Sequence, residues 1–299
     1  MAMNTLTSEQ YYADTEYLSN SALSHFVKFD FYWTPRYNIH EFLNPPKLSS
    51  DAVLIGSLVD RILTEWFNID DEYWPQLDKA WMQEQLELMG VEFKKADTNP
   101  VLRDLLAKNG FVFKKELPNA VRESIETIVQ TAHKFRYDMT TSLLEFIAES
   151  DSQCIIVNDD WGMRGKFDFI NHKREIISDL KTTGNIDILE RELIYKGQPN
   201  IYHKYVRQLA IYQELYRRET GKTYQVELIV IDYKWHHRVI RIGQKAIDKS
   251  LEQVYKDIEV LGQMYSGEKN FIETYEISDE QPLINPVAVT EEDFLTDFE

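Results

Sequence analysis

The feature that most constrains this chain is the stretch "GKFDFINHKREIISDLKTT", residues 165–183, in which charged side chains interrupt two apolar runs. Asp168 and Asp179 each lie inside a β-rich run, and Lys181 follows Asp179 by two residues. Polar groups in such surroundings cost free energy unless they are paired or bind a metal. Because "NHKRE" offers a turn between the two runs, the stretch predicts a β-hairpin with a buried polar site.

The spacing of the two aspartates predicts how they lie in that hairpin. Asp168 and Asp179 are equidistant from the Lys-Arg pair of the turn, so a hairpin centred there would set them opposite each other, with Cβ atoms about 4.5–5.5 Å apart. Lys181 should share the face of Asp179, because side chains alternate along a strand. The intervening apolar side chains should point the other way, into the core: Phe167, Phe169 and Leu180.

Two facing carboxylates and a lysine suit a particular chemistry. A divalent cation would relieve the repulsion between the carboxylates, and hard oxygen ligands favour Mg²⁺ or Mn²⁺. A cation and an ammonium group beside it are what phosphodiester hydrolysis requires, since both offset negative charge in the transition state. The alternative is an Asp–Lys ion pair on a solvent-facing hairpin. A second Asp-x-Lys triplet, "DYK" at residues 232–234, provides a comparison within the chain, because it has no acid at the upstream position that Asp168 occupies relative to the first triplet.

The periodicity changes along the chain from helical to β-rich. Helical spacing is evident in residues 18–30, 52–67 and 119–150, and again in 202–220 and 244–265, whereas five β-rich runs occur after residue 153. This pattern predicts an α+β (α/β) fold with a mixed β-sheet of about five strands flanked by helices. We expect a helical N-terminal part, 1–150, packed on the core, a core at 151–266, and an acidic C-terminal tail at 267–299.

Composition narrows the class of partner and the compartment. The net charge of −17 argues against nonspecific polyanion binding by the whole surface, but residues 161–250 hold 17 Lys and Arg against 11 Asp and Glu. A local basic face is compatible with phosphate contacts at one site. The single cysteine, Cys154, excludes an intramolecular disulfide. No apolar run is long enough to cross a bilayer and no secretion signal is evident, so we expect a cytoplasmic protein, in a bacterial or phage-infected host cytosol.

Several segments together resemble a known group of enzymes. "YLSNSALSHF", "IGSLVDRIL", "GKFDFI", "DLKTT" and "QLAIY" occur in the order and approximate spacing of the PD-(D/E)XK nuclease superfamily, and the chain is most similar to its phage exonuclease VIII (RecE-like) and RecB-type nuclease group. The resemblance covers roughly residues 18–265. It implies a restriction-endonuclease-like PD-(D/E)XK core at 151–266, to which the helix containing Gly56–Asp60 contributes.

The resemblance also implies roles for individual residues. Asp168 and Asp179 would bind the metal, Lys181 would be catalytic, and Gln208 and Tyr212 would complete the site. From spacing alone, Gln208 and Tyr212 share a helix face, since they are four residues apart. Without the resemblance they would more often be a surface glutamine and a core tyrosine.

One position departs from the family pattern. The family helix usually supplies a histidine ligand to the metal, whereas this chain has Asp60 in "GSLVD". Aspartate also binds Mg²⁺ or Mn²⁺, so Asp60 is either a retained metal ligand or a degraded position. We favour the retained ligand, because an aspartate in so apolar a helix otherwise requires an explanation.

The resemblance implies a metal-dependent deoxyribonuclease, a 5′–3′ exonuclease acting on double-stranded DNA ends in phage-type recombination. Two alternatives remain open: a non-catalytic DNA-binding or assembly subunit on a decayed nuclease fold, and an endonuclease of the same superfamily. Related exonucleases form rings, so a homo-oligomer is expected from the resemblance. The acidic tail suggests docking on a basic partner such as a single-strand annealing recombinase, although a solvated end is the simpler interpretation.

Overall fold

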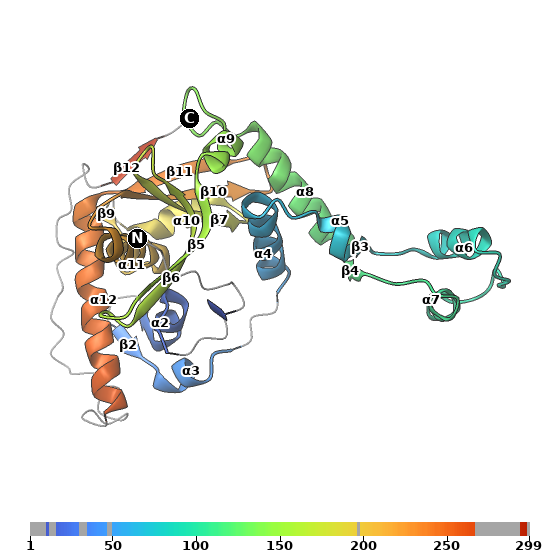
Figure 1. Cartoon of the computed structure of the whole chain (residues 1–299), viewed down its shortest axis with the longest axis horizontal. Helices are drawn as coiled ribbons and strands as arrows, with labels where there is room; N and C mark the ends of the chain where they lie inside the picture. Colours follow the sequence, from blue (N-terminus) through green and yellow to red (C-terminus); the bar gives the residue numbers. More distant parts are fainter. Residues whose placement is uncertain are drawn as a thin grey trace.

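The centre of the molecule is a mixed β-sheet. The computed structural model describes residues 10–11, 16–29, 35–46, 50–195, 198–266 and 294–297. Six strands form the sheet in the order β12-β11-β10-β7-β6-β5, in which β10 and β7 are parallel and all other neighbours antiparallel (Figure 1). The strands are β5 (Asp151–Asn158), β6 (Met163–Asn171), β7 (Ile176–Thr183), β10 (Gln225–Asp232), β11 (His237–Ile242) and β12 (Phe294–Asp297). The predicted α+β class and all five predicted strands are confirmed.

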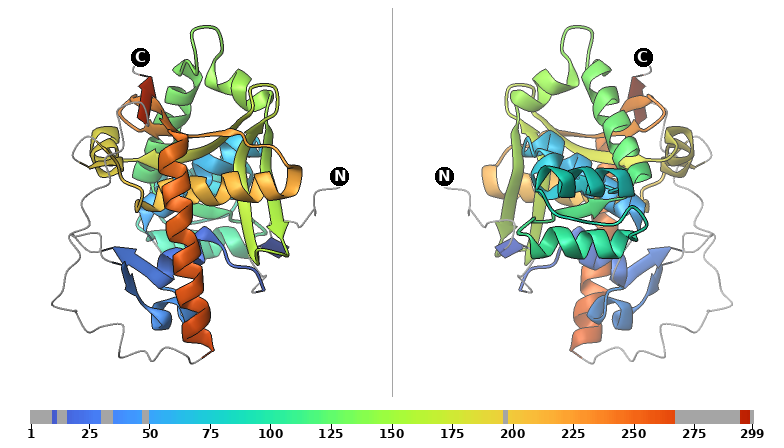
Figure 2. Two further views of the ribbon diagram at one scale, coloured as in Figure 1. Left: turned by 90° about the vertical axis from the view of Figure 1, so that its left-hand side faces the viewer. Right: turned by 90° about the vertical axis from the view of Figure 1, so that its right-hand side faces the viewer.

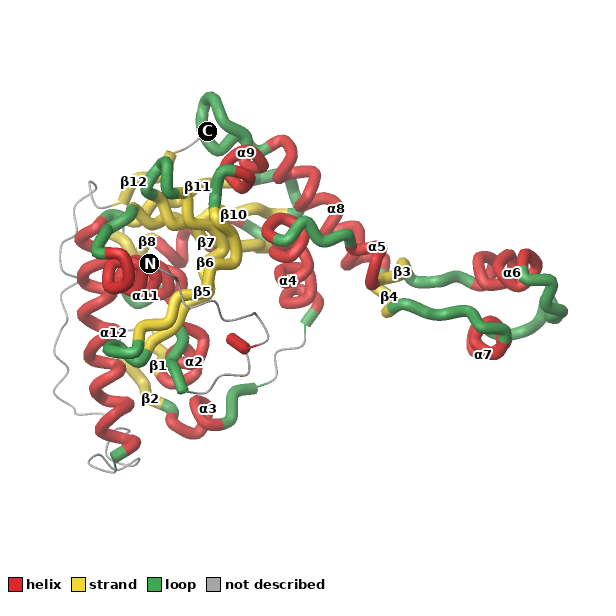
Figure 3. Tube along the Cα trace, in the orientation of Figure 1, coloured by secondary structure: helices red, strands yellow, loops and turns green. Residues whose placement is uncertain are grey.

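Helices cover both faces of this sheet, and each face has its own apolar core (Figure 3). The first face carries α2 (Asn20–Phe26), α11 (Lys204–Thr220) and α12 (Gln244–Tyr265), of which the last two cross each other (Figure 2). The second face carries α4 (Asp51–Thr64), α8 (Asn119–Lys134) and α9 (Leu143–Ala148). The sheet therefore lies between two helical layers, as the periodicity of the sequence predicted.

Local sequence signals define several helix ends. Ser19 Oγ accepts a hydrogen bond from Ala22 N at 3.2 Å, and Ser50 Oγ accepts from Val53 N at 3.3 Å, so both serines cap a helix. Gly221 ends α11 with φ of 72°, a left-handed conformation that glycine adopts without strain. Each of these residues lies directly beside the helix end that it caps.

Two expectations about the helices are wrong. Residues 119–150 do not form one helical region: α8 ends at Lys134, and α9 begins at Leu143 after a turn in which Asp138 accepts hydrogen bonds from two backbone amides. The side chain of Asp138 thus competes with the helix for backbone donors. The α4 sequence is nearly apolar all round and predicts a buried helix, but Val53 is 45% exposed and the fully buried residues all lie in its C-terminal half.

An arm extends away from the body between α4 and α8 (Figure 1). At its base, two short strands pair with each other. Its tip has a separate apolar core made of Met82, Leu86, Leu102 and Leu106. Its elements are α5 (Ile69–Glu72), β3 (Tyr73–Pro75), α6 (Lys79–Leu88), α7 (Asn99–Lys108) and β4 (Lys115–Leu117). The helical pattern of these residues was visible in the sequence, but their separation from the main core was not.

The remaining elements are short and lie near the first face. They are β1 (Val27–Phe29), β2 (Pro35–Tyr37), α3 (Ile39–Leu43), α10 (Ile186–Leu193), β8 (Ile194–Tyr195) and β9 (Gln198–Pro199). Part of an aromatic stretch, "FDFYWTPRYN" at residues 29–38, lies here: the Phe29 ring is 4.7 Å from Tyr202, and the Tyr37 ring is 5.1 Å from Phe26. Residues 30–34 of that segment lie outside the described residues.

Most of the predicted acidic tail also lies outside the described residues. Phe294–Asp297, however, forms the edge strand β12 and pairs antiparallel with β11 of the same chain. Within the described residues, no helix has both the length and the apolar character that spanning a membrane requires.

Candidate active site

The predicted hairpin exists and has the predicted centre. In β6 and β7, Phe169 lies opposite Ser178 and Ile170 opposite Ile177. The regular pairing ends there, next to the two aspartates, and Asp168 Oδ2 accepts a hydrogen bond from the Leu180 amide at 2.8 Å. A buried carboxylate thus takes a backbone donor of the neighbouring strand, which fixes Asp168 against β7.

The expected alternation of the apolar residues is only partly right. Phe169 and Leu180 belong to the same core cluster, as predicted. Phe167 belongs to the other cluster and stacks on Tyr212 of α11, with ring centroids 4.4 Å apart. The prediction that Phe167 and Phe169 share a face is therefore wrong, because the regular pairing of β6 with β7 ends between them.

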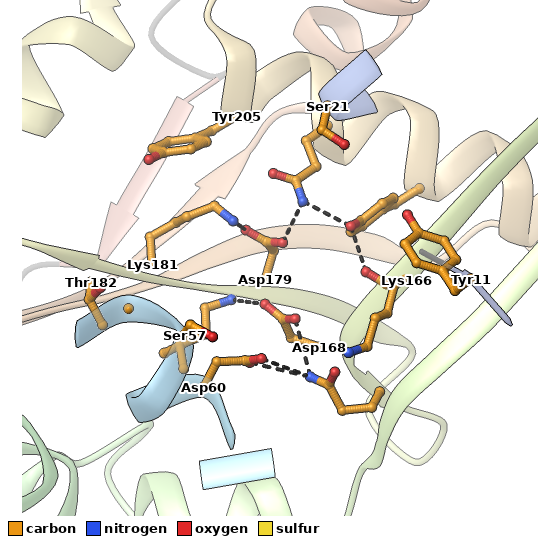
Figure 4. Close-up of a pocket in the computed structure, with 15 residues that line it drawn as sticks. Tyr11, Ser21, Ser57, Asp60, Lys166, Asp168, Asp179, Lys181, Thr182 and Tyr205 are labelled. Carbon is orange, nitrogen blue, oxygen red and sulfur yellow. Dashed lines mark hydrogen bonds and ion pairs between the residues drawn. The ribbon is translucent and has the colours of Figure 1, made fainter. Parts of the chain in front are cut away.

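All six predicted site residues line one cavity of about 410 Å³ (Figure 4). The hairpin contributes Asp168, Asp179 and Lys181, which come from two neighbouring strands. The other three come from helices on opposite faces of the sheet: Asp60 from α4, and Gln208 and Tyr212 from α11. The cavity therefore lies between the two helical layers, where the pairing of β6 with β7 ends.

Lys181 is directed at the acids. Its Nζ forms an ion pair with Asp179 Oδ2, and the Lys181 side chain is only 18% exposed. Burial acts to lower the pKa of Lys181, but the nearby carboxylates of Asp179 and Asp168 outweigh burial and raise it. Lys181 is therefore a cation at neutral pH in this arrangement.

The acids are held close enough to perturb one another. Burial is the largest cause that raises the pKa of Asp168, and the charges of Asp179 and Asp60 add to it. Burial also raises the pKa of Asp179, against which Lys181 and a hydrogen bond with Asp168 act. The raised pKa values mean that the ionised forms of these two carboxylates are disfavoured. A cation bound between them would stabilise the ionised forms.

Gln208 and Tyr212 connect α11 to these acids. Gln208 Nε2 donates to Asp179 Oδ1 and contacts the Tyr212 hydroxyl oxygen, both at 2.8 Å. The Tyr212 hydroxyl in turn donates to the Lys166 carbonyl at 2.6 Å. This chain of hydrogen bonds fixes the orientation of the Asp179 carboxylate relative to the sheet.

Asp60 reaches the cavity from the other side and has a partner that the sequence did not reveal. Gln153 Nε2 donates to Asp60 Oδ1 at 3.2 Å and lies 3.5 Å from Asp168 Oδ1. Burial, with smaller contributions from neighbouring charges, raises the pKa of Asp60 to about 6. Gln153 has φ of 53°, which is unusual for a residue other than glycine inside a strand. Gln153 was missed because a single glutamine in an apolar run carries no periodic signal.

The donor set fits a hard divalent cation. Asp60, Asp168 and Asp179 all present carboxylate oxygens to the cavity. Gln153 Oε1, which also lines the cavity, is buried without a hydrogen-bond partner. Such an orphaned buried oxygen suggests an additional ligand. Within the described residues, however, no group of three or more His, Cys, Asp or Glu is already gathered closely enough to hold a metal.

The second Asp-x-Lys triplet has a purely structural place. Asp232 Oδ1 accepts hydrogen bonds from Lys234 N at 2.8 Å and His236 N at 2.9 Å, so this aspartate stabilises the turn between β10 and β11. Lys234 is exposed and does not line the cavity. The upstream acid therefore distinguishes the two triplets, as the sequence comparison indicated.

Fold and site together define a protein of the PD-(D/E)XK class. A comparison with family profiles matches residues 40–274 to the PDDEXK-like domain of unknown function (DUF3799), and the chain belongs to that family. Among solved structures, the chain is similar to a "putative exonuclease" from Eubacterium rectale, with a TM-score of 0.56 and 21% identity over 89% of this chain and 88% of that one. No curated protein matches. The family and the shared fold support nuclease function in general terms.

Proposed function

We propose that this protein is a metal-dependent DNA nuclease whose active site is the cavity between α4, β6, β7 and α11. The observation that carries the proposal is the meeting of Asp168, Asp179 and Lys181 in one cavity. Asp168 and Asp179, with Asp60 from α4, would hold Mg²⁺ or Mn²⁺. A cation held there supplies charge that polarises a phosphoryl oxygen of the substrate and activates the attacking water.

The residues of the chain would share the remaining work. Lys181, protonated beside Asp179, orients the attacking water and offsets negative charge that develops on the phosphate. Gln208 holds Asp179 through a 2.8 Å hydrogen bond, and Tyr212 holds Gln208. Gln153 restrains Asp60 beside Asp168. Each acid thus has a second side chain or backbone group that fixes its direction.

The test is hydrolysis of linear duplex DNA by purified protein with Mg²⁺ or Mn²⁺. Lys181→Ala should lower the rate by at least about 100-fold, which is the usual cost of removing one group that stabilises transition-state charge. Lys234→Ala is the matched control, since it removes the lysine of the other Asp-x-Lys triplet. Equal activity of Lys181→Ala and the parent would refute the assignment.

We further propose, from the family resemblance, a 5′–3′ exonuclease acting on double-stranded ends in phage-type recombination. Closed circular DNA distinguishes this from an endonuclease, because an obligate exonuclease leaves it intact. Substrates labelled at one 5′ or one 3′ end give the direction of degradation. A homo-oligomer and a single-strand annealing partner stay predictions of the sequence.

A non-catalytic DNA-binding or assembly subunit is the rival, motivated by Asp60 in place of the family histidine. Calorimetric titration with Mg²⁺ and Mn²⁺ separates the two proposals. Binding of either ion that is lost in Asp168→Asn supports the enzyme. Absence of binding by the parent favours the inert subunit.

A further inference from the structure

A second cavity, of about 540 Å³, lies on the other side of the first turns of α11. Lys204 and Arg207 of α11 line this cavity, whereas Tyr205 and Gln208 of the same helix line the candidate active site. Its remaining walls come from the end of α2, from β1, from the end of α10 and from the loop before α11. We call it the α11 basic pocket.

The charge of this pocket is opposite to that of the whole chain. Four Lys or Arg side chains line it, Lys28, Arg191, Lys204 and Arg207, against one acid, Glu192. Lys28 is paired with Glu41, but within the described part of the chain Arg191 and Lys204 make no ion pair. An excess of unpaired cations is notable on a chain with a net charge of −17.

Arg207 is the central observation, because it is a buried charge that forms no direct ion pair with a described residue. Arg207 is only 4% exposed. Its guanidinium group donates hydrogen bonds to two neutral oxygens, Asn20 Oδ1 at 3.3 Å and Ser24 Oγ at 2.5 Å. No carboxylate of the described residues forms an ion pair with it. Burial lowers the pKa of Arg207 to about 10, against which the negative charge of the buried Asp257 acts, so Arg207 is still charged at neutral pH. A buried charge in this state is stabilised by an anion.

The walls of the pocket indicate which anion. Arg side chains match the geometry of phosphate oxygens, and Lys204 and Arg191 would add charge at the mouth. Beside them the rings of Phe29 and Tyr202, 4.7 Å apart, offer an aromatic wall on which a base can stack. Cations next to an aromatic wall are the combination that single-stranded nucleic acid binds.

We propose that the α11 basic pocket binds a phosphodiester and the adjoining base of a single DNA strand, one helix away from the site of hydrolysis. The inference rests on the proposed function, since it assigns the pocket to the same strand. The pocket would retain the strand outside the catalytic centre, so it contributes to binding and not to the chemical step.

The test measures strand binding without hydrolysis. A fluorescent single-stranded oligothymidylate is titrated with protein in EDTA, and anisotropy is recorded from low salt to 1 M salt. The Arg191→Ala/Lys204→Ala variant should reduce the log–log salt slope by about 1.4, at about 0.7 per phosphate contact, which is about 25-fold in affinity at 0.1 M salt. Lys222→Ala/Lys234→Ala removes the same charge at exposed positions outside the pocket and should leave the slope unchanged.

Arg207→Met provides an independent measurement of the buried charge. Because Arg207 forms no direct ion pair and methionine fills a similar volume, this variant should stay folded. Oligothymidylate should raise the Tm of the parent and not that of Arg207→Met. If Arg207→Met fails to fold, the Arg191→Ala/Lys204→Ala binding result decides alone.

The outcomes separate this inference from the proposed function. Strand binding that depends on the pocket supports the inference even if the protein hydrolyses no DNA. Hydrolysis that depends on Lys181, together with equal strand binding by the pocket and control variants, overturns the inference and leaves the proposed function intact. Binding of an acidic peptide such as polyglutamate in preference to the oligonucleotide would assign the pocket to a protein partner and also overturn it.

Discussion

Gly165→Ala tests how closely α11 approaches the sheet. A Cβ atom at Gly165 would lie 2.9 Å from Leu215 Cδ1 and 3.0 Å from Tyr212 Cε1, both on α11. The Tyr212 ring cannot easily withdraw, because it stacks on Phe167 at 4.4 Å and its hydroxyl donates to the Lys166 carbonyl at 2.6 Å. The glycine is thus required by a close contact and not by its backbone conformation.

The expected cost follows from two opposing effects. Inserting a methyl group into a packed contact costs about 1–3 kcal/mol. Replacing glycine by alanine also restricts the unfolded chain, which returns about 0.4–1 kcal/mol. Gly165→Ala should therefore lower the free energy of unfolding by about 1–2 kcal/mol, and it should weaken the Gln208–Tyr212 contact that orients Asp179.

Urea unfolding followed by circular dichroism measures the effect as a change in midpoint at constant slope. Gly262→Ala is the matched control: Gly262 lies inside α12 with no atom within 4 Å of the added methyl group, so this change should stabilise the protein by about 1 kcal/mol. If Gly165→Ala is as stable as Gly262→Ala, α11 does not approach β6 as described, and the argument for the Tyr212 contact fails.

Two further substitutions probe the site and its surroundings. Gln153→Ala should weaken Mg²⁺ binding or activity about 10- to 100-fold, because it removes the amide that restrains the carboxylates of Asp60 and Asp168. Calorimetric affinities or hydrolysis rates equal to those of the parent would contradict this. Burial lowers the pKa of His203 from the usual 6.5 to about 4, so the folded state favours the neutral imidazole. The stability that this preference contributes at neutral pH should be lost progressively as pH falls from about 6.5 to about 4. The total loss should be up to about 3 kcal/mol. Unfolding of His203→Asn across this range should show a flatter pH dependence, and an unchanged profile would refute the assignment.

The hairpin and the helix caps could be predicted from the sequence because their determinants are local. The turn "NHKRE" and the flanking apolar runs fix the centre of the β6–β7 pairing, and Ser19 and Ser50 are each adjacent to the helix they cap. Gln208 and Tyr212 are different. Their spacing indicates a shared helix face but not the strand they meet, so only the family resemblance linked them to Asp179.

Contacts between distant segments could not be predicted. Gln153 reaches Asp60 across 93 residues of sequence, and Arg207 reaches Ser24 across 183. Both depend on how helices pack on the two faces of the sheet, which no local pattern encodes. The position of Phe167 failed for a related reason: strand alternation assumes regular pairing, and the pairing ends at the very residues that form the site.

The arrangement around Asp60 bears on whether the site has decayed. Buried charges are costly, and replacing a buried ionic group by apolar residues is often neutral or stabilising, so a site without function is free to lose them. Here Asp168, Asp179 and Lys181 line one cavity, and Asp60 has an amide partner in Gln153. A position that had merely degraded from histidine would not need that partner, nor the left-handed backbone of Gln153 that brings its amide into the cavity. The proposed all-oxygen site for a hard cation would account for the aspartate, its partner and the lysine together.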